Sequence, residues 1–230
     1  MCARYTLTEE IVLILKRLLV KNLLPDFKPR YNIAPSQIAP VILNEGERSI
    51  QLFRWGLIPS WAKDPKIGYQ LINARAESIA EKPSFRTAFK KRRCLIPADG
   101  FYEWHQESDG RTKTPMRVRL KSKEPFTFAG LWETWKDPQE KEVRTFTIIT
   151  TEPNEVLQPI HNRMPVIMKP EDEEAWLDPH ADPKHLVKVL SPYPEKEMEA
   201  YAVAKLVNSP KHDSPDCIEP AMAPFPSTLF

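Results

Sequence analysis

The chain has 230 residues, 41% of them hydrophobic, which is enough to bury one sizeable core, and its formal net charge is +2 at pH 7. So small a charge gives no general attraction to nucleic acid, so a local basic patch would have to meet an anionic partner. Cys2, Cys94 and Cys217 form an odd, scattered set, which argues against a disulfide framework or a structural zinc site and is typical of a reducing cytosol. No stretch predicts a membrane span or a signal peptide, so we expect a soluble, cytoplasmic protein.

The predicted elements are short. Apolar residues at helical spacing between Ile11 and Leu19 predict a helix that is capped at Thr6 or Thr8 and ends near Asn22. Residues 31–35 are bounded by proline and predict an ordered loop. Residues 41–43 and 50–55 flank Asn44-Glu45-Gly46 and predict a hairpin. Further strands are expected over 93–97, 101–104, 116–121, 126–129, 144–150, 164–168 and 201–207, and helices over 76–91 (broken at Pro83), 171–177 and 182–190.

Many short strands with a few helices between them predict an α+β fold. We expect a single domain over residues 1–230, with a largely antiparallel, barrel-like sheet and a few peripheral helices. No internal repeat or linker divides the chain.

Cys2 directly follows the initiator methionine, and a residue this small normally allows Met1 to be removed. Removal would leave a cysteine with a free α-amine, a 1,2-aminothiol that condenses with an aldehyde first to an imine and then to a five-membered thiazolidine. The second step is intramolecular, and such proximity can contribute ~7–11 kcal/mol. The reference pKa is about 7.7–8.0 for the amine and about 8.5 for the thiol, so both reactive forms exist near neutrality. The position of Cys2 alone is also consistent with an ordinary residue in a frayed terminus, which follows the initiator methionine by chance.

Three polar residues lie where irregular segments meet predicted strands: Asn73, Glu103 and His161. Aromatic residues flank Glu103, and an apolar setting raises the pKa of a carboxyl group and suits it to act as an acid. Each residue also has an ordinary structural interpretation. Asn73 could be a turn residue, Glu103 the exposed member of an alternating strand, and His161 a hydrogen-bonded loop histidine.

Single arginines lie beside these polar candidates, namely Arg4, Arg75 and Arg163. With Trp61 and Trp104 they supply the phosphate contacts and stacking surfaces that single-stranded DNA binding needs. The basic run over residues 90–93 is more typical of a solvated face. The chain has no glycine-rich phosphate loop, no G-x-S-x-G and no HExxH motif, so we expect neither a cofactor nor a metal.

Taken together, the motifs resemble those of the SOS-response-associated peptidase (SRAP) family of abasic-site processing proteins. The resemblance rests on blocks in the family's order along nearly the whole chain: Met1-Cys2-Ala3-Arg4-Tyr5, Tyr31-Asn32-Ile33-Ala34-Pro35, Trp55-Gly56-Leu57-Ile58-Pro59-Ser60-Trp61, Asn73-Ala74-Arg75-Ala76-Glu77, Cys94 through Trp104, Phe128-Ala129-Gly130-Leu131-Trp132, Ile160-His161-Asn162-Arg163-Met164-Pro165 and Val207-Asn208-Ser209-Pro210.

The resemblance implies a DNA-damage function in which Cys2 crosslinks covalently to abasic sites in single-stranded DNA, a lyase-type activity linked to the SOS response. It implies catalytic roles for Cys2, Asn73, Glu103 and His161. It also implies DNA contacts from Arg4, Arg75 and Arg163, with Pro35 and Trp61 in DNA-facing loops. The family's usual glycine after the cysteine is Ala3 here, which would be unfavourable if that position needs a positive φ. We expect a monomer that joins the nucleoid when it binds DNA.

Two alternatives remain open. Cys2 and His161 are also the residue types of a thiol peptidase, with Asn73 or Glu103 orienting the histidine and Met1 as the residue removed by self-processing. The second alternative is a non-catalytic adaptor that binds nucleic acid. Crosslinking to abasic DNA and peptide turnover that depends on Cys2 distinguish the three.

Overall fold

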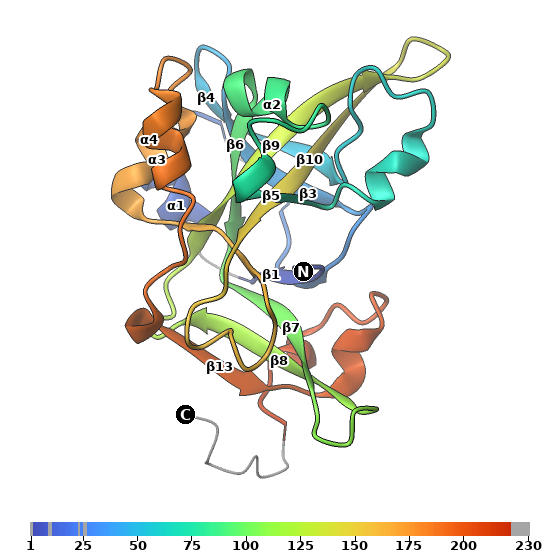
Figure 1. Cartoon of the computed structure of the whole chain (residues 1–230), viewed down its shortest axis with the longest axis vertical. Coiled ribbons are helices and arrows are strands. Elements are labelled where there is room, and N and C mark those ends of the chain that lie inside the picture. The colour runs from blue at the N-terminus through green and yellow to red at the C-terminus, as the bar shows by residue number, and fades with distance from the viewer. Residues whose placement is uncertain (1, 9–10, 23, 25–26, 222–230) are drawn as a thin grey trace.

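Five strands close into a barrel, the upper half of the molecule in Figure 1. The computed structural model describes residues 2–8, 11–22, 24 and 27–221. Around the barrel the order is β10-β4-β3-β6-β9, and β9 pairs with β10 to complete the circle. Every neighbouring pair is antiparallel except β4 and β10, which run parallel. The predicted barrel-like, largely antiparallel sheet is therefore confirmed. The barrel strands are β3 (Ile38–Asn44), β4 (Arg48–Trp55), β6 (Arg93–Ala98), β9 (Phe126–Lys136) and β10 (Glu142–Thr151).

A second, antiparallel sheet lies below the barrel, in the order β13-β8-β7-β1-β2. The two sheets are covalently continuous, because β6 ends at Ala98 and β7 begins at Gly100. The strands of this sheet are β1 (Tyr5–Leu7), β2 (Arg30–Ile33), β7 (Gly100–Gln106), β8 (Lys113–Leu120) and β13 (Met198–Ala202). Three short strands extend the barrel sheet: β5 (Asn73–Arg75) and β11 (Met164–Pro165) pair with β10, and β12 (Ile167–Met168) pairs with β9.

Three α-helices, α1 (Ile11–Arg17), α2 (Arg86–Lys91) and α3 (Pro170–Leu177), pack on the outside of the barrel against β6, and α2 also contacts β9 (Figure 1). The fourth is α4 (Pro183–Lys188). Of the 3₁₀ helices, η2 (Ala76–Ser78) contacts β10, whereas η4 (Lys205–Asn208) and η5 (Pro215–Cys217) contact β8 and β2 of the second sheet. The other 3₁₀ helices are η1 (Pro65–Tyr69) and η3 (Glu195–Glu197). Asp182 caps α4 as predicted, since its carboxylate accepts the Lys184 N–H. None of the helices in the described part of the chain has the length and apolar character that crossing a membrane requires.

The sequence prediction was wrong in four places. Thr6, one of the two predicted caps of the first helix, lies in strand β1, where its hydroxyl donates to Asp99. The first helix ends at Arg17 and not near Asn22, because the backbone turns left-handed at Leu19, where φ is 51°. Residues 30–33 form strand β2 and not a loop; Asp213 accepts the backbone N–H groups of Tyr31 and Asn32. The last strand, β13, begins before the expected range 201–207 and ends at Ala202, and the end of that range falls in the 3₁₀ helix η4 (Lys205–Asn208).

One hydrophobic core joins the two sheets. The Tyr5 ring of β1 lies edge-on to Trp55, with centroids 5.3 Å apart, and to Phe128, at 5.9 Å. Phe101 of β7 contacts Phe128 from the other side, at 6.0 Å. Cys2 belongs to this same core. Aromatic packing therefore holds the beginning of the chain between the barrel and the second sheet.

Candidate functional site

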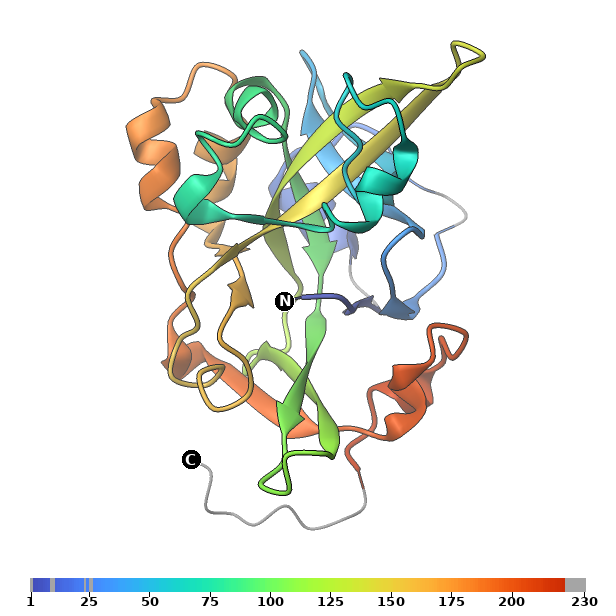
Figure 2. The same cartoon turned by 45° about the vertical axis from the view of Figure 1, so that its right-hand side comes forward.

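Residues 2–4 lead into β1 between the barrel and the second sheet, as both views show (Figures 1 and 2). Arg4 fixes this segment. Its carbonyl accepts the Tyr102 N–H at 3.0 Å, and its guanidinium donates to Val207 O at 2.6 Å and to Asn32 Oδ1 at 3.1 Å. The same guanidinium lies 5.9 Å from the centre of the Trp104 ring. The Val207-Asn208-Ser209-Pro210 motif therefore acts, at least in part, as a support for the N-terminal segment.

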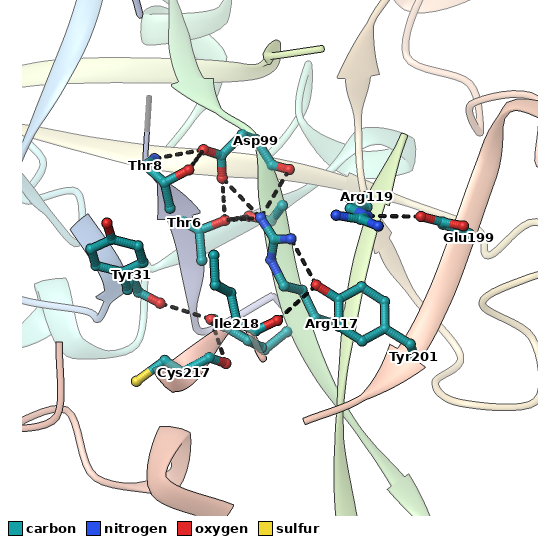
Figure 3. A network of polar contacts seen from close by, with 12 residues as sticks. Thr6, Thr8, Tyr31, Asp99, Arg117, Arg119, Glu199, Tyr201, Cys217 and Ile218 are labelled. Atoms are coloured by element: carbon teal, nitrogen blue, oxygen red, sulfur yellow. Dashed lines mark hydrogen bonds and ion pairs between the residues drawn. The ribbon is translucent and has the colours of Figure 1, made fainter. Parts of the chain in front are cut away.

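A buried polar network holds β1 against β7 and β8 (Figure 3). The Asp99 carboxylate accepts hydrogen bonds from the Thr6 hydroxyl, from the Thr8 N–H and hydroxyl, and from the Arg117 guanidinium at 3.2 Å. Arg117 also donates to the Tyr201 hydroxyl at 2.9 Å, which in turn donates to Ile218 O. Three strands and the C-terminal segment therefore meet at the Asp99–Arg117 ion pair. Thr6, a member of this network, lies four residues after Cys2.

Cys2 and Glu103 lie close together in a buried setting. The Cys2 side chain is fully buried, and its Sγ lies 3.8 Å from Arg4 O. Burial raises the pKa of the Cys2 thiol well above its ordinary value, and the neighbouring Glu103 carboxylate raises it further. Glu103 of β7 is 3% exposed, and burial raises the pKa of its carboxyl group to about 7. The predicted direction of this shift is confirmed, and Glu103 exchanges a proton near neutral pH.

The loop that carries His161 covers the same face of β7. Glu103 and His105 are two residues apart on a strand and so point to one face. His105 Nδ1 lies 3.0 Å from Pro159 O, and Leu157 of this loop belongs to the core that contains Cys2. His161 is therefore brought to the side of the sheet on which Glu103 lies.

His161 is held as a neutral ring. Its Nδ1 lies 3.0 Å from Arg163 N and 3.2 Å from Arg163 O, and the shorter contact assigns Nδ1 as the acceptor of the Arg163 N–H and the ring proton to Nε2. Burial lowers the pKa of the imidazole. A neutral histidine with a defined tautomer can pass a proton without carrying a fixed charge.

Asn73 lies at the start of β5, beside the core that contains Cys2. The indole N–H of Trp55 donates to Ile72 O at 2.9 Å, and Trp55 packs on Tyr5. Asn73 Nδ2 donates to Ile72 O at 3.0 Å, whereas its Oδ1 is buried and accepts no hydrogen bond within the described residues. A buried amide oxygen with unused acceptor capacity is costly unless a ligand supplies a donor.

The three predicted DNA-contacting arginines differ in their surroundings. Arg163 forms a bidentate ion pair with Glu77, at 2.6 and 3.0 Å, and donates to Thr150 O at 2.7 Å. Arg4 is committed largely to backbone carbonyls. Arg75 is exposed, opposite Thr150 in the β5–β10 pairing. Arg75 is therefore the most accessible of the three to a phosphate.

Pro35, Trp61 and Trp104 also lie in different settings. Pro35 begins a turn in which Ser36 has a φ of 70°, next to the end of β4. Trp61 is 59% exposed. Trp104 is partly buried, and its indole donates to Asn208 Oδ1 at 2.7 Å. Trp104 thus supports Arg4 and the C-terminal segment.

The basic run is only partly a solvated face. Arg92 pairs with Glu133, and the Arg93 guanidinium is buried and donates to the carbonyls of Phe89, Lys90, Trp176 and Asp178. Arg93 therefore stabilises the ends of α2 and α3, whereas Arg92 is joined to β9.

Sequence reasoning assigned no role to two residues that position the site, Asn32 and Asp99. Both fall in motif blocks that the resemblance rested on. Asn32 is fully buried; its amide donates to Val207 O, Ser209 O and His212 O, and its oxygen accepts from Arg4. The available signal was a polar residue inside an apolar motif, which predicts burial with satisfied hydrogen bonds.

The chain is similar to known proteins in both sequence and fold. The family model described as SOS response associated peptidase (SRAP) matches residues 1–210. Abasic site processing protein YoqW of Bacillus subtilis (strain 168) is 51% identical over 223 residues, which cover 95% of this chain and 99% of the relative. Abasic site processing protein HMCES of Gallus gallus is 32% identical over 226 residues, 84% of this chain and 67% of the relative.

Solved structures match the fold. A protein from Bacteroides thetaiotaomicron superimposes with a TM-score of 0.87 at 29% identity, over 96% of this chain and all of that one. A protein from Bordetella bronchiseptica superimposes with a TM-score of 0.74 at 25% identity. The fold, the motif blocks and the family match lead to one conclusion: the chain belongs to the SRAP family.

Proposed function

We propose that this chain processes abasic sites by forming a covalent thiazolidine between Cys2 and the ring-opened sugar in single-stranded DNA. The observation that carries the proposal is that the Cys2 thiol and the Glu103 carboxyl group are both buried and near enough for the Glu103 charge to raise the pKa of the thiol, while burial raises the pKa of Glu103 to about 7. The similarity to proteins named abasic site processing proteins supports the substrate.

The chemistry requires removal of Met1, which frees the α-amine of Cys2. An abasic deoxyribose exists mostly as a closed hemiacetal, and only its open form carries the C1′ aldehyde. The amine nitrogen adds to C1′, and loss of the oxygen as water gives an imine. The sulfur then adds to the same carbon, and the thiol proton ends on the nitrogen. One water is lost overall, and the ring closure is favoured by proximity.

Glu103 is the proton carrier of this scheme. At neutral pH a carboxyl group with a pKa of about 7 is present in both forms. Its acid form protonates the departing hydroxyl, and its carboxylate accepts the proton of the Cys2 thiol, which burial keeps protonated. A positioned acid–base group of this kind typically contributes about 10²–10⁴ in rate.

Asn73 and His161 position the sugar. The buried Oδ1 of Asn73 is an acceptor for the α-amine or a sugar hydroxyl. The Nε2–H of neutral His161 donates to the sugar and serves in ring opening or in reversal of the crosslink. Arg75 contacts phosphates, and such contacts carry no base specificity. A single strand or a junction is favoured, because there the abasic nucleotide leaves the stack at little cost.

The test uses purified protein and single-stranded DNA with one abasic site, analysed on a denaturing gel. The parent chain is expected to give a slowly migrating crosslink, and Cys2→Ala none. A chain in which a non-removable residue precedes Cys2 is the matched control, because it keeps the thiol but turns the amine into an amide. A crosslink of parental yield in either variant would refute the proposal.

A thiol peptidase is the less favoured alternative. A Cys–His nucleophile needs a thiolate, which is stabilised by a neighbouring cation. Burial and Glu103 instead raise the pKa of Cys2, and burial lowers that of His161. Peptide turnover that depends on Cys2 and ignores DNA would favour the peptidase.

A further inference from the structure

The segment that carries His161 is anchored at its start. We call residues 154–163 the His161 loop. Asn154 is buried, and its amide group donates to Tyr193 O at 2.8 Å and accepts the Leu157 N–H at 3.1 Å. The His161 N–H bonds in turn to Leu157 O at 2.8 Å. These hydrogen bonds fix the internal geometry of the loop, but none of them joins it to β7.

The side chain of His105 makes that connection. Its Nδ1 atom lies 3.0 Å from Pro159 O, two residues before His161. Because a carbonyl oxygen only accepts hydrogen bonds, Nδ1 carries the proton and donates it. His105 follows Glu103 by two residues and shares its face of the sheet. One short stretch of β7 therefore supplies both the Glu103 carboxyl group and the contact to the His161 loop.

The His161 ring lies near the same end of the β7–β8 hairpin. Burial is the main cause of the lowered pKa of His161, and the positive charge of Lys113 contributes to the same shift. Lys113 begins β8 and pairs with Gln106, the neighbour of His105 in β7. In Figure 1 the loop crosses in front of the second sheet. The loop and the hairpin therefore approach each other where His105 forms its hydrogen bond.

We infer that His105 is a positioning residue: its hydrogen bond to Pro159 O holds the His161 loop on β7 and so fixes the His161 ring relative to Glu103. This inference rests on the proposed function, in which Glu103 carries protons and His161 donates to the same sugar. Two groups that act on one sugar must keep their separation, and a misplacement of about 1 Å can slow a reaction about 10²-fold. A strand carries Glu103 and a loop carries His161, so a bond between the two elements sets that separation. Sequence reasoning assigned His105 no role.

The experiment measures the rate of crosslinking at saturating single-stranded DNA with one abasic site, so that binding does not limit it. His105→Ala removes the donor and is expected to slow the reaction about three- to tenfold, the effect of one net hydrogen bond. His105→Asn places an amide N–H at the position of Nδ1 and should react within about twofold of the parent. Gln106→Ala is the matched control, since Gln106 Nε2 donates at 3.0 Å to Thr112 O within the hairpin. It should leave the rate unchanged.

A double-mutant cycle separates positioning from a general loss of structure. In a His161→Ala background the ring that His105 positions is absent, so adding His105→Ala should change the rate by less than about twofold. A merely structural role would slow both backgrounds equally. An equal loss in the two backgrounds, a parental rate in His105→Ala, or no recovery in His105→Asn would overturn the inference.

Hydrogen exchange in the free protein keeps this outcome separate from that of the proposed function. The amide groups of the His161 loop should exchange faster in His105→Ala than in the parent, and at the parental rate in His105→Asn. If the parent fails to crosslink abasic DNA but this pattern appears, the anchoring of the loop by His105 stands and the crosslink proposal fails. If the parent crosslinks and His105→Ala exchanges and reacts as the parent does, the positioning role fails alone.

Discussion

Glu103 combines a reactivity gain with a stability cost. Its pKa is raised from 4.5 to about 7. Below pH 4.5 the Glu103 carboxyl group is protonated in both the folded and the unfolded chain, so its ionisation does not affect stability. Between pH 4.5 and pH 7 Glu103 loses its proton only in the unfolded chain, so the free energy of unfolding falls as pH rises. Above pH 7 the loss of stability is constant, at about 3 kcal/mol.

Glu103→Gln is therefore expected to stabilise the fold relative to the parent at about pH 8, to have little effect near pH 4.5, and to slow crosslinking by about 10²–10⁴. Urea unfolding at the two pH values, together with crosslinking time courses, measures both effects. A stability difference that is the same at both pH values would contradict the raised pKa.

Ala3 is a second residue with a specific expectation. Positive φ among the described non-glycine residues occurs only at Leu19, Ser36, Lys123 and Glu140, so Ala3 adopts an ordinary backbone conformation. The family's usual glycine is then not required for conformational reasons. Ala3→Gly should change the crosslinking rate by less than about threefold and the stability by about 0.5–1 kcal/mol at most. A rate increase of tenfold or more would mean that the methyl group obstructs DNA.

At the level of elements, β1 matters most, because it begins three residues after Cys2. Asp99 and Arg117 are both nearly buried, at 10% and 4% side-chain exposure. Asp99→Ala removes the carboxylate that accepts hydrogen bonds from Arg117 and from two threonine hydroxyls of the network. Removal of one partner of a buried ion pair typically costs about 3–5 kcal/mol. Glu199→Ala breaks the more exposed pair with Arg119 on the same sheet and should cost less than about 1 kcal/mol. Equal losses in thermal unfolding would show that the network does not fasten β1.

The elements that could be predicted are those with a local signal. The β3–β4 hairpin follows from its apolar strands around Asn44-Glu45-Gly46, and α4 from Asp182 and Pro183. Strands β1, β2 and β5 have three or four residues each, too few for a periodic pattern. Their pairing partners lie far along the chain, such as Phe101 opposite Tyr5, and only the folded sheet specifies them.

At the level of the whole molecule, the fold class could be predicted but the arrangement of the two sheets could not. Alternating patterns indicate antiparallel strands, whereas the parallel pairing of Arg54 with Thr145 joins strands about ninety residues apart. The candidate site likewise depends on contacts between residues that lie far apart in the sequence. Cys2 and Glu103 are singled out by their own neighbours in sequence, but their proximity depends on Asp99, Asn32 and Arg4, whose side chains act across both sheets.

The small net charge is likewise distributed unevenly, because Arg4, Arg93 and Arg163 bond to groups within the chain. Exposed Arg75 is expected to be a principal phosphate contact. Arg75→Gln should reduce the slope of log affinity against log salt by about one in Cys2→Ala titrations with single-stranded DNA, and Lys184→Gln should leave it unchanged. An unaltered slope in Arg75→Gln would remove this residue from the DNA contacts.

The most direct test of the central claim is the intact mass of the crosslinked species formed with abasic single-stranded DNA. The account predicts the mass of a chain that begins at Cys2, plus the oligonucleotide, minus one water, because imine formation releases water and ring closure releases nothing. A crosslinked species that still carries Met1 would contradict it, since the amine that starts the reaction would then belong to another residue.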